Sequence, residues 1–264
     1  MKTVDLPESF EEWRQISRKL LEQEVHPSEV LWTTRSELGL GFNDDEDVQV
    51  APTNQKTGYR VPKQFLELAE SVSCHRDLAK WKLLYDLLWK LTHGEPHLLK
   101  IGLDPDLIRC YRMIRAIRRD CHKMKAFVRF REIESVDLSD RSQTHFVAWF
   151  EPQHLIVPRM APFFKKRFAN NHWSILTPDT CVHWNQKKMF FTKGADKSMA
   201  PKADDFEHLW FTYYKNIFNP ARLKEKAMLS EMPKKYWKNL PESSLIPKLI
   251  EKGKRRDVSR DWQF

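Results

Sequence analysis

An α+β fold is the class that this 264-residue sequence predicts, from three observations. Apolar residues recur at helical spacing up to about residue 125, short alternating segments follow as far as residue 194, and helical spacing returns near residue 205. We therefore expect a helical N-terminal half, an antiparallel sheet of about five short strands flanked by helices, and a helical C-terminus. We divide the chain into a helical region, 1–100, and a basic α+β region, 101–264, and expect both to form one compact unit.

The first helix is predicted from Ser9 to Glu24, because Ser9 with Glu12 three residues later is the pattern of a capping box. Pro27 ends this helix, and residues 29–34 are predicted to form a short strand.

Three segments follow before residue 100. Residues 39–58 are rich in Gly, Asn, Asp and Pro, which predicts an exposed connection. Pro62 opens a second helix, and Asp77 caps a third that is apolar nearly all round. This third helix is expected to be central to the helical half.

Residues 104–133 are predicted to form one long helix that runs into a strand beginning near residue 125. Asp104 is the expected N-cap, and Pro105 falls at the first helical position. Residues 109–131 hold nine basic residues and one acidic residue, a net charge of +8 against +9 for the whole protein. The apolar stripe recurs at steps of three and four: Leu103, Leu107, Cys110, Ile114, Ile117, Cys121 and Met124.

A row of cations lies opposite that stripe, while Arg118 and Lys125 are expected nearer to it. A charged helix face is ordinarily just solvated, but such faces mix the two signs of charge. Cations with no Glu at i±4 repel one another by roughly 0.2–0.5 kcal/mol per close pair. A bound polyanion such as nucleic-acid phosphate would relieve that cost. The row consists of Arg112, Arg115, Arg119, His122 and Lys123.

After this helix the pattern changes to short strands around one helix, which is predicted over residues 162–170. Residues 185–187 are typical of the tight turn of a hairpin. This order predicts an antiparallel sheet with helices against it. The strands are expected over residues 125–133, 144–151, 173–178, 180–185 and 188–194.

Further cations are candidates for holding phosphate. Tyr236 and Trp237 lie among lysines, and aromatic rings interleaved with amines can stack bases. The alternative is that both rings are core anchors. The other candidate nucleic-acid-binding residues are Arg129, Arg131, Lys165, Lys166, Lys234 and Lys235.

Catalytic signals are weak. Asp120 and His122 are two residues apart on a helix and do not face each other, and Asp120 is expected to pair either with a neighbour of Arg119 or with Lys123 at i+3. The remaining candidate acid–base residues are His145 and Glu151. Cys181 and His183 share one face of a strand and could supply ligands or a proton shuttle, with core packing as the alternative.

Several classes of protein are excluded. The four cysteines form no CxxC pair, so we expect free thiols, no metal and no cofactor in this chain. No phosphate loop, dinucleotide fingerprint or nucleophile elbow occurs. No run of about 18 apolar residues and no signal core is present, so we expect a soluble, cytoplasmic protein.

Long runs of the chain resemble a bacterial family of unknown function whose members are described as DNA metabolism proteins. The resemblance implies a DNA repair setting and assigns no catalytic residue. In that family, some members continue into a uracil-DNA-glycosylase-like domain, which is not expected in this chain, and others lie beside a radical SAM protein. The runs are MIRAIRRDCHKMKAFVRFRE, HFVAWFEPQHLIVPRMAPFFKKRF, WSILTP and WFTYYKNIFNPARLKEKAMLSEMPKKYWKNLPESSLIP.

Three functions remain open. The first is a nucleic-acid-binding component of DNA repair or modification that grips phosphates and acts with a radical SAM or glycosylase partner. The second is a stand-alone enzyme acting on a nucleic-acid base or backbone. The third is a scaffold whose basic surface meets an acidic protein partner.

Overall fold

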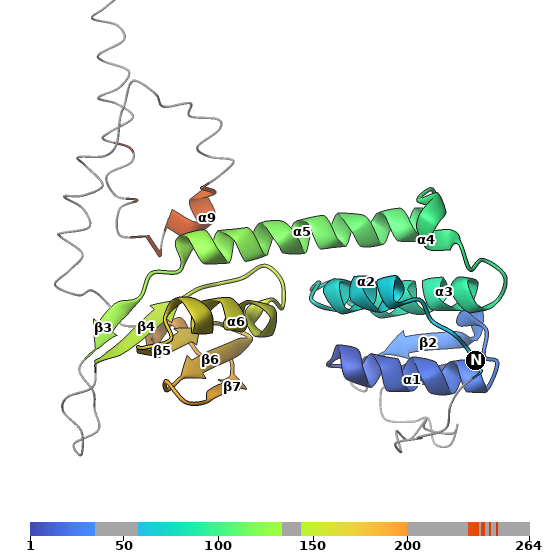
Figure 1. Ribbon diagram of the computed structural model, residues 1–264, viewed down its shortest axis with the longest axis horizontal. Helices are drawn as coiled ribbons and strands as arrows, with labels where there is room; N and C mark the ends of the chain where they lie inside the picture. Colours follow the sequence, from blue (N-terminus) through green and yellow to red (C-terminus); the bar gives the residue numbers. More distant parts are fainter. Residues whose placement is uncertain are drawn as a thin grey trace, which may run out of the picture. The chain divides into compact units, whose positions relative to one another are not determined.

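The computed structural model describes residues 1–34, 58–133, 144–199, 232–237, 239–240, 243 and 247. The chain divides into two compact units, Met1–Arg119 and Asp120–Phe264. The long helix α5 (Pro105–Phe127) contains the boundary between them (Figure 1). In the described part of the chain, no helix is long and apolar enough to cross a membrane.

The first unit combines a small sheet with helices. Its two strands, β1 (Lys2–Asp5) and β2 (Val30–Thr33), pair in parallel. The second strand was expected, whereas the first was not predicted. The helices are α1 (Phe10–Glu22), the 3₁₀ turn η1 (Pro27–Glu29), α2 (Lys63–Ser73), α3 (Lys80–Thr92) and α4 (Leu98–Ile101).

The predicted N-cap of α1 is confirmed. Ser9 Oγ accepts the N–H of Glu12 at 3.2 Å, and Glu12 Oε2 accepts the N–H of Glu8 at 2.8 Å. The helix ends at Glu22, before the predicted Glu24, which has a positive φ of 53°. A non-glycine residue in that region terminates a helix.

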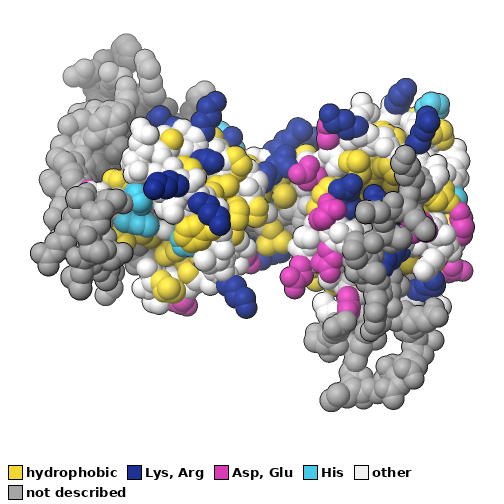
Figure 2. Space-filling view, turned by 60° about the horizontal axis from the view of Figure 1, so that its bottom comes forward, with side chains coloured by type: hydrophobic (Ala, Val, Ile, Leu, Met, Phe, Trp, Pro, Cys, Tyr) yellow, Lys and Arg dark blue, Asp and Glu magenta, His cyan; other side chains and the backbone are white. Residues whose placement is uncertain are grey.

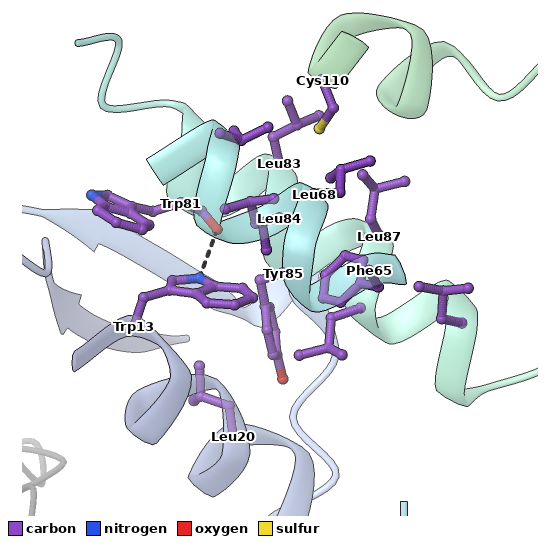
Figure 3. Packing of buried hydrophobic residues seen from close by; sticks show 14 of the residues in the cluster. Trp13, Leu20, Phe65, Leu68, Trp81, Leu83, Leu84, Tyr85, Leu87 and Cys110 are labelled. Carbon is purple, nitrogen blue, oxygen red and sulfur yellow. Dashed lines mark hydrogen bonds between the residues drawn. The ribbon is translucent and has the colours of Figure 1, made fainter. Parts of the chain in front are cut away.

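Helix α3 is central to the first unit, as its all-round apolar pattern predicted (Figure 3). Trp13 Nε1 donates to the backbone oxygen of Trp81 at 3.2 Å, and this bond ties α1 to α3. Tyr85 Oη donates to the backbone oxygen of Val25 at 2.7 Å. Aromatic rings that bury a polar atom need such partners, which fix the packing of one helix on the next.

The start of α5 follows the prediction. Asp104 Oδ1 accepts the N–H groups of Asp106 and Leu107 at 2.8 and 3.0 Å, and Pro105 is the first helical residue. Lys90 Nζ lies 2.8 Å from a carboxylate oxygen of both Asp104 and Asp106. The apolar stripe is buried at Leu107, Cys110, Ile114, Ile117 and Met124.

The ends of the stripe differ from the prediction. Leu103 precedes the helix and is 78% exposed, and Cys121 is half-buried. The helix continues to Phe127, where a strand was expected from residue 125. Arg129 Nη1 donates to the backbone oxygens of Ala126 and Val128, so the arginine side chain stabilises the last turn.

The second unit contains a five-stranded sheet in the order β3-β4-β5-β6-β7, flanked by helices. Three neighbouring pairs are antiparallel, and β4 and β5 pair in parallel. The fold class is therefore as predicted, except for that one pair. The helix between β4 and β5 returns the chain to the same end of the sheet, which gives parallel strands. The strands are β3 (Arg131–Ile133), β4 (His145–Trp149), β5 (His172–Leu176), β6 (Thr180–Trp184) and β7 (Met189–Lys193).

Helix α6 (Val157–Arg167) is this crossover. It begins before the predicted Pro162, which lies inside it, because Ile156 and Val157 are buried with the rest of its apolar face. The predicted hairpin between β6 and β7 is confirmed, since Asn185 Oδ1 accepts two backbone N–H groups and Gln186 has a φ of 66°.

Two short helical segments complete the described part, η2 (Lys197–Met199) and α9 (Lys234–Trp237). The exposed connection predicted over 39–58 lies outside the described residues except for Gly58. The helices predicted between residues 205 and 231 also lie outside them, as does the helix predicted after residue 243, apart from Pro247.

Candidate nucleic-acid interface

Four exposed arginines form one face of α5: Arg112, Arg115, Arg118 and Arg119, named here the α5 basic face. Spacings of three, four and seven residues place their side chains on one side of a helix. Within the residues that the structure describes, no carboxylate lies in ion-pair range of these four guanidinium groups. Arg118 was expected nearer the apolar stripe, but it is exposed and extends the face.

The face begins at Arg112 because the preceding arginine has a partner. Arg109 Nη2 lies 3.4 Å from an oxygen of Asp77. Acidic residues on the helix itself are directed elsewhere: Asp106 holds Lys90, and Asp120 is buried. The four cations therefore repel one another, with no compensating charge on their own helix.

The remaining cations of α5 contact aromatic rings. Lys123 is half-buried, with Nζ 5.8 Å from the ring centroid of Phe127. Lys125 is exposed, and its Nζ lies 4.8 Å from the centroid of Phe163. His122 is exposed on the same helix. Cation–π contacts of this kind hold an amine in place.

Acidic and basic side chains are distributed unevenly over the two units. On the face drawn in Figure 2, Asp and Glu gather on the first unit, whereas Lys, Arg and His predominate over acidic side chains on the second. Lys165 and Lys166 are exposed in the last turn of α6, and Lys165 Nζ lies 4.7 Å from the ring centroid of Trp184. Cations also suit a helix C-terminus, so these two lysines have a structural role as well.

The two arginines after α5 are less available than expected. Arg129 is half-buried, and its guanidinium donates to backbone oxygens at the end of the helix. Arg131 is half-buried in β3, where it pairs with Val147. A guanidinium committed to backbone oxygens has fewer donors left for a phosphate.

Tyr236 and Trp237 are placed as core anchors, the alternative to base stacking. Tyr236 is 3% exposed, with its ring stacked against Phe127 at 5.2 Å and Phe150 at 5.5 Å. Trp237 is half-buried, and its Nε1 donates to the backbone oxygen of Met232 at 3.0 Å. A ring that is closed off from solvent cannot stack a base. Lys234 and Lys235, on the same short helix, are exposed.

The sequence predicted an ion pair between Asp120 and Lys123, and the structure gives Asp120 other partners. It is 2% exposed, its Oδ2 accepts the N–H of His154 at 2.9 Å, and its Oδ1 accepts the hydroxyl of Tyr236 at 3.2 Å. Burial raises the pKa of this carboxyl, although these hydrogen bonds act in the opposite direction. The buried carboxylate links the end of α5 to the segment at His154 and to α9, which is a structural role.

A chain of hydrogen bonds crosses one face of the sheet. Ser174 Oγ lies 2.9 Å from His145 Nε2 and 2.8 Å from His183 Nδ1, and His183 Nε2 lies 2.9 Å from Thr192 Oγ1. Ser174 is 5% exposed, and both histidines are half-buried. Figure 2 shows histidine side chains close together on the second unit.

The bond from Thr192 to the backbone favours one direction of donation along this chain. Thr192 donates to the backbone oxygen of Lys193 at 3.4 Å and accepts from His183 Nε2. Ser174 then donates to His183 Nδ1 and accepts from His145 Nε2, so His183 is neutral, with its proton on Nε2. Burial lowers the pKa of both histidines, which favours the neutral form of each ring.

Sequence reasoning found both histidines and missed the serine between them. Ser174 and His183 are directly paired across β5 and β6, and this register cannot be deduced from spacing along either strand. Cys181 and His183 share a face, as predicted, but Cys181 bonds locally to Thr177. Glu151 accepts from Trp149 Nε1 at 2.9 Å and lies 3.8 Å from Lys197 Nζ.

No group of three or more potential metal ligands is assembled among the residues with a described placement.

Comparison with known proteins gives one family match. Residues 79–242, more than half of the chain, match the model of a family described as a domain of unknown function, DUF4130. No curated protein and no solved structure matches the chain.

Proposed function

This chain belongs to the DUF4130 family, a domain of unknown function, and we propose from its own geometry that it binds nucleic acid through phosphate contacts made by the α5 basic face. The observation that carries the proposal is the group of four exposed arginines on one helix without a described carboxylate partner. Guanidinium groups bind phosphate oxygens in a bidentate geometry and remain charged at all physiological pH values.

The energetics favour a bound polyanion over a merely solvated face. Three close pairs on this face, Arg112–Arg115, Arg115–Arg118 and Arg115–Arg119, repel by about 0.2–0.5 kcal/mol each. A nucleic acid converts this unfavourable term into attraction and releases the counterions condensed along its phosphates. The exposed lysines of α6 and α9 in the second unit are additional candidate contacts.

Binding with this origin depends steeply on salt. The logarithm of the binding constant falls by about 0.9 per phosphate contact for each unit of log salt, so four contacts give a slope of about −3.6. The dissociation constant is then expected to rise by about 150-fold between roughly 50 and 200 mM salt. Fluorescence anisotropy with labelled duplex and single-stranded oligonucleotides measures this slope.

Single substitutions make the test specific. Each of Arg112→Gln, Arg115→Gln and Arg119→Gln is expected to reduce the magnitude of the slope by about one, for any oligonucleotide sequence. Arg18→Gln, which changes an exposed arginine on α1, is the matched control and should leave the slope unchanged. Absence of binding to either form of DNA at low salt would refute the proposal, and so would equal effects of all four variants.

The setting of this activity is proposed from the resemblance alone. We assign the chain to DNA repair or modification, in which it would present DNA to a radical SAM protein or a uracil-DNA-glycosylase-like protein. Co-purification of a radical SAM protein or a glycosylase-like protein with this chain, strengthened by DNA, is the expected result. If neither the radical SAM protein nor the glycosylase-like protein binds this chain, the proposed partnership is refuted. The DNA-binding proposal is then tested only by the salt dependence and the arginine variants.

The second candidate function is catalysis on a nucleic-acid base or backbone, and the chain through Ser174 favours it. Two neutral histidines joined through one hydroxyl can move a proton across the sheet face. Assays of the purified protein on lesion-bearing oligonucleotides test this candidate. Turnover that is lost in Ser174→Ala and His183→Gln with binding intact would favour it, and inactivity of the wild-type protein would exclude an enzyme that acts alone on those substrates.

A further inference from the structure

The turn between α4 and α5 exposes two large apolar side chains. Ile101 is 64% exposed and Leu103 is 78% exposed, with only Gly102 between them. The spacing predicted Leu103 to be part of the buried stripe of α5, so its exposure is a finding of the structure. We call Ile101, Gly102 and Leu103 the 101–103 turn.

This turn is held firmly at its base. On one side Leu98 is 3% exposed, and on the other side Leu107 is fully buried. Asp104 caps α5 through two backbone N–H groups, and Lys90 of α3 lies 2.8 Å from its carboxylate. The two apolar side chains are therefore presented on a fixed support instead of a loose loop.

Among the described residues, the tip of the turn has open space around it. Gly102 has a φ of 70°, and a Cβ built on it would meet nothing within 4 Å. In Figure 1, α4 stands at the N-terminal end of α5, on the side turned away from α2 and α3. The 101–103 turn and the α5 basic face thus belong to the same unit and to one continuous segment of chain.

We propose that the 101–103 turn is a wedge that inserts Ile101 and Leu103 between neighbouring base pairs of duplex DNA and bends it. The inference rests on the proposed function and names its substrate as a double helix. Single exposed apolar residues are ordinary on protein surfaces, but two of them on a rigid tip beside a row of arginines need a partner with an apolar interior. The base stack of DNA is such a partner, and proteins that kink DNA insert Leu or Ile side chains into it.

The charges around the turn favour bases over phosphates at this point. Asp104 and Asp106 stand at the base of the turn and share Lys90, and exposed Lys100 directly precedes Ile101, so the charges next to the turn nearly balance and give no strong attraction for a phosphate. The arginines begin further along the helix. The apolar tip would contact bases, and the arginines further along the same segment would contact phosphates.

The dimensions suit a duplex. From Pro105, the first helical residue after the turn, to Arg119 the helical rise is about 21 Å, which spans about six base pairs at roughly 3.4 Å each. The wedge and the last arginine of the face would therefore contact the same duplex within one helical turn of DNA. Bending toward the protein brings the phosphates of that turn closer to the arginines.

The experiment uses the full chain and a duplex with donor and acceptor dyes at its two ends. Wild-type protein is expected to raise energy transfer at saturation, with a bend in the range of about 20–90°. The double variant Ile101→Ser/Leu103→Ser should bind about tenfold more weakly, with an unchanged salt slope and without the bend. Leu78→Ser, which changes a 51% exposed leucine elsewhere in the same unit, is the matched control and should behave as the wild type.

The outcomes separate this inference from the proposed function. Salt-dependent binding without a bend, or a double variant that bends DNA as the wild type does, would overturn the wedge and leave the arginine contacts standing. A double variant that changes only self-association, measured by sedimentation, would assign the surface to a second copy of the chain and also overturn the wedge. A wild-type protein that binds no duplex at low salt would overturn both.

Discussion

Replacing Asp120 by alanine is expected to destabilise the second unit by about 2–4 kcal/mol. The substitution leaves two donors without an acceptor, the part-buried N–H of His154 and the buried hydroxyl of Tyr236. Each unsatisfied buried donor costs about 1–3 kcal/mol, which gives about 2–6 kcal/mol together. The upper part of that range is not expected, because burial raises the pKa of Asp120 and the wild-type carboxylate therefore already carries a desolvation cost.

The pH dependence of this effect has a definite sign. Since the folded-state pKa of Asp120 is raised, the carboxyl stabilises the fold most when it is protonated, below its unfolded-state pKa. That contribution is lost as the pH rises through the raised pKa. The cost of Asp120→Ala should therefore be larger in mildly acidic buffer than at neutral pH.

Two measurements check this prediction. Urea denaturation followed by circular dichroism gives the change in the free energy of unfolding, and hydrogen exchange of the His154 amide reports the local bond. Asp196→Ala is the matched control, because Asp196 is exposed and also accepts a backbone N–H, that of Ser198 at 2.8 Å. Asp196→Ala should cost no more than about 0.5 kcal/mol. Equal denaturation midpoints for the two variants, with unchanged exchange at His154, would show that Asp120 does not join these segments.

Three further effects follow from buried or paired charges. Burial lowers the pKa of Lys80 to about 8, so stability should rise as the pH goes from about 8 to 10.5, and Lys80→Met should remove up to about 3 kcal/mol of that rise in a denaturation series. Lys90→Gln removes the cation that the two carboxylates at the start of α5 share. It should lower the free energy of unfolding by about 1 kcal/mol, seen as a slightly lower melting temperature, with a smaller effect in high salt. Burial lowers the pKa of His145 and His183, so the second unit should lose stability as the pH falls below about 6.5, and it should lose less in His183→Gln; an identical pH profile in that variant would contradict the neutral chain.

Features set by neighbouring residues could be predicted from the sequence. The caps of α1 and α5 and the Asn185 turn all depend on contacts within a few residues. Three arginines of the α5 basic face belong to this group, since helical spacing alone gathers Arg112, Arg115 and Arg119. Arg118, which was placed nearer the apolar stripe, does not. The fold class followed as well, because the order of helical and strand patterns limits the possible layers.

Features set by distant partners could not be predicted. The parallel pairing of β4 and β5, the burial of Tyr236 and the chain through Ser174 each join residues that lie far apart in the sequence or on different strands. A one-residue change of register would send Ser174 to the other face of the sheet, and no local pattern fixes that register. The partner of Asp120 was mispredicted for the same reason.

By itself, the sequence determined which residues carry charge and which side of α5 they occupy, since those properties depend on residue type and helical period. Only the tertiary structure decided which charges have partners. Asp120 is closed into the second unit and Arg109 has Asp77 beside it, whereas Arg112 and Arg115 have no described carboxylate in range. The exposure of Leu103 was decided in the same way, because a side chain is buried only where another segment covers it.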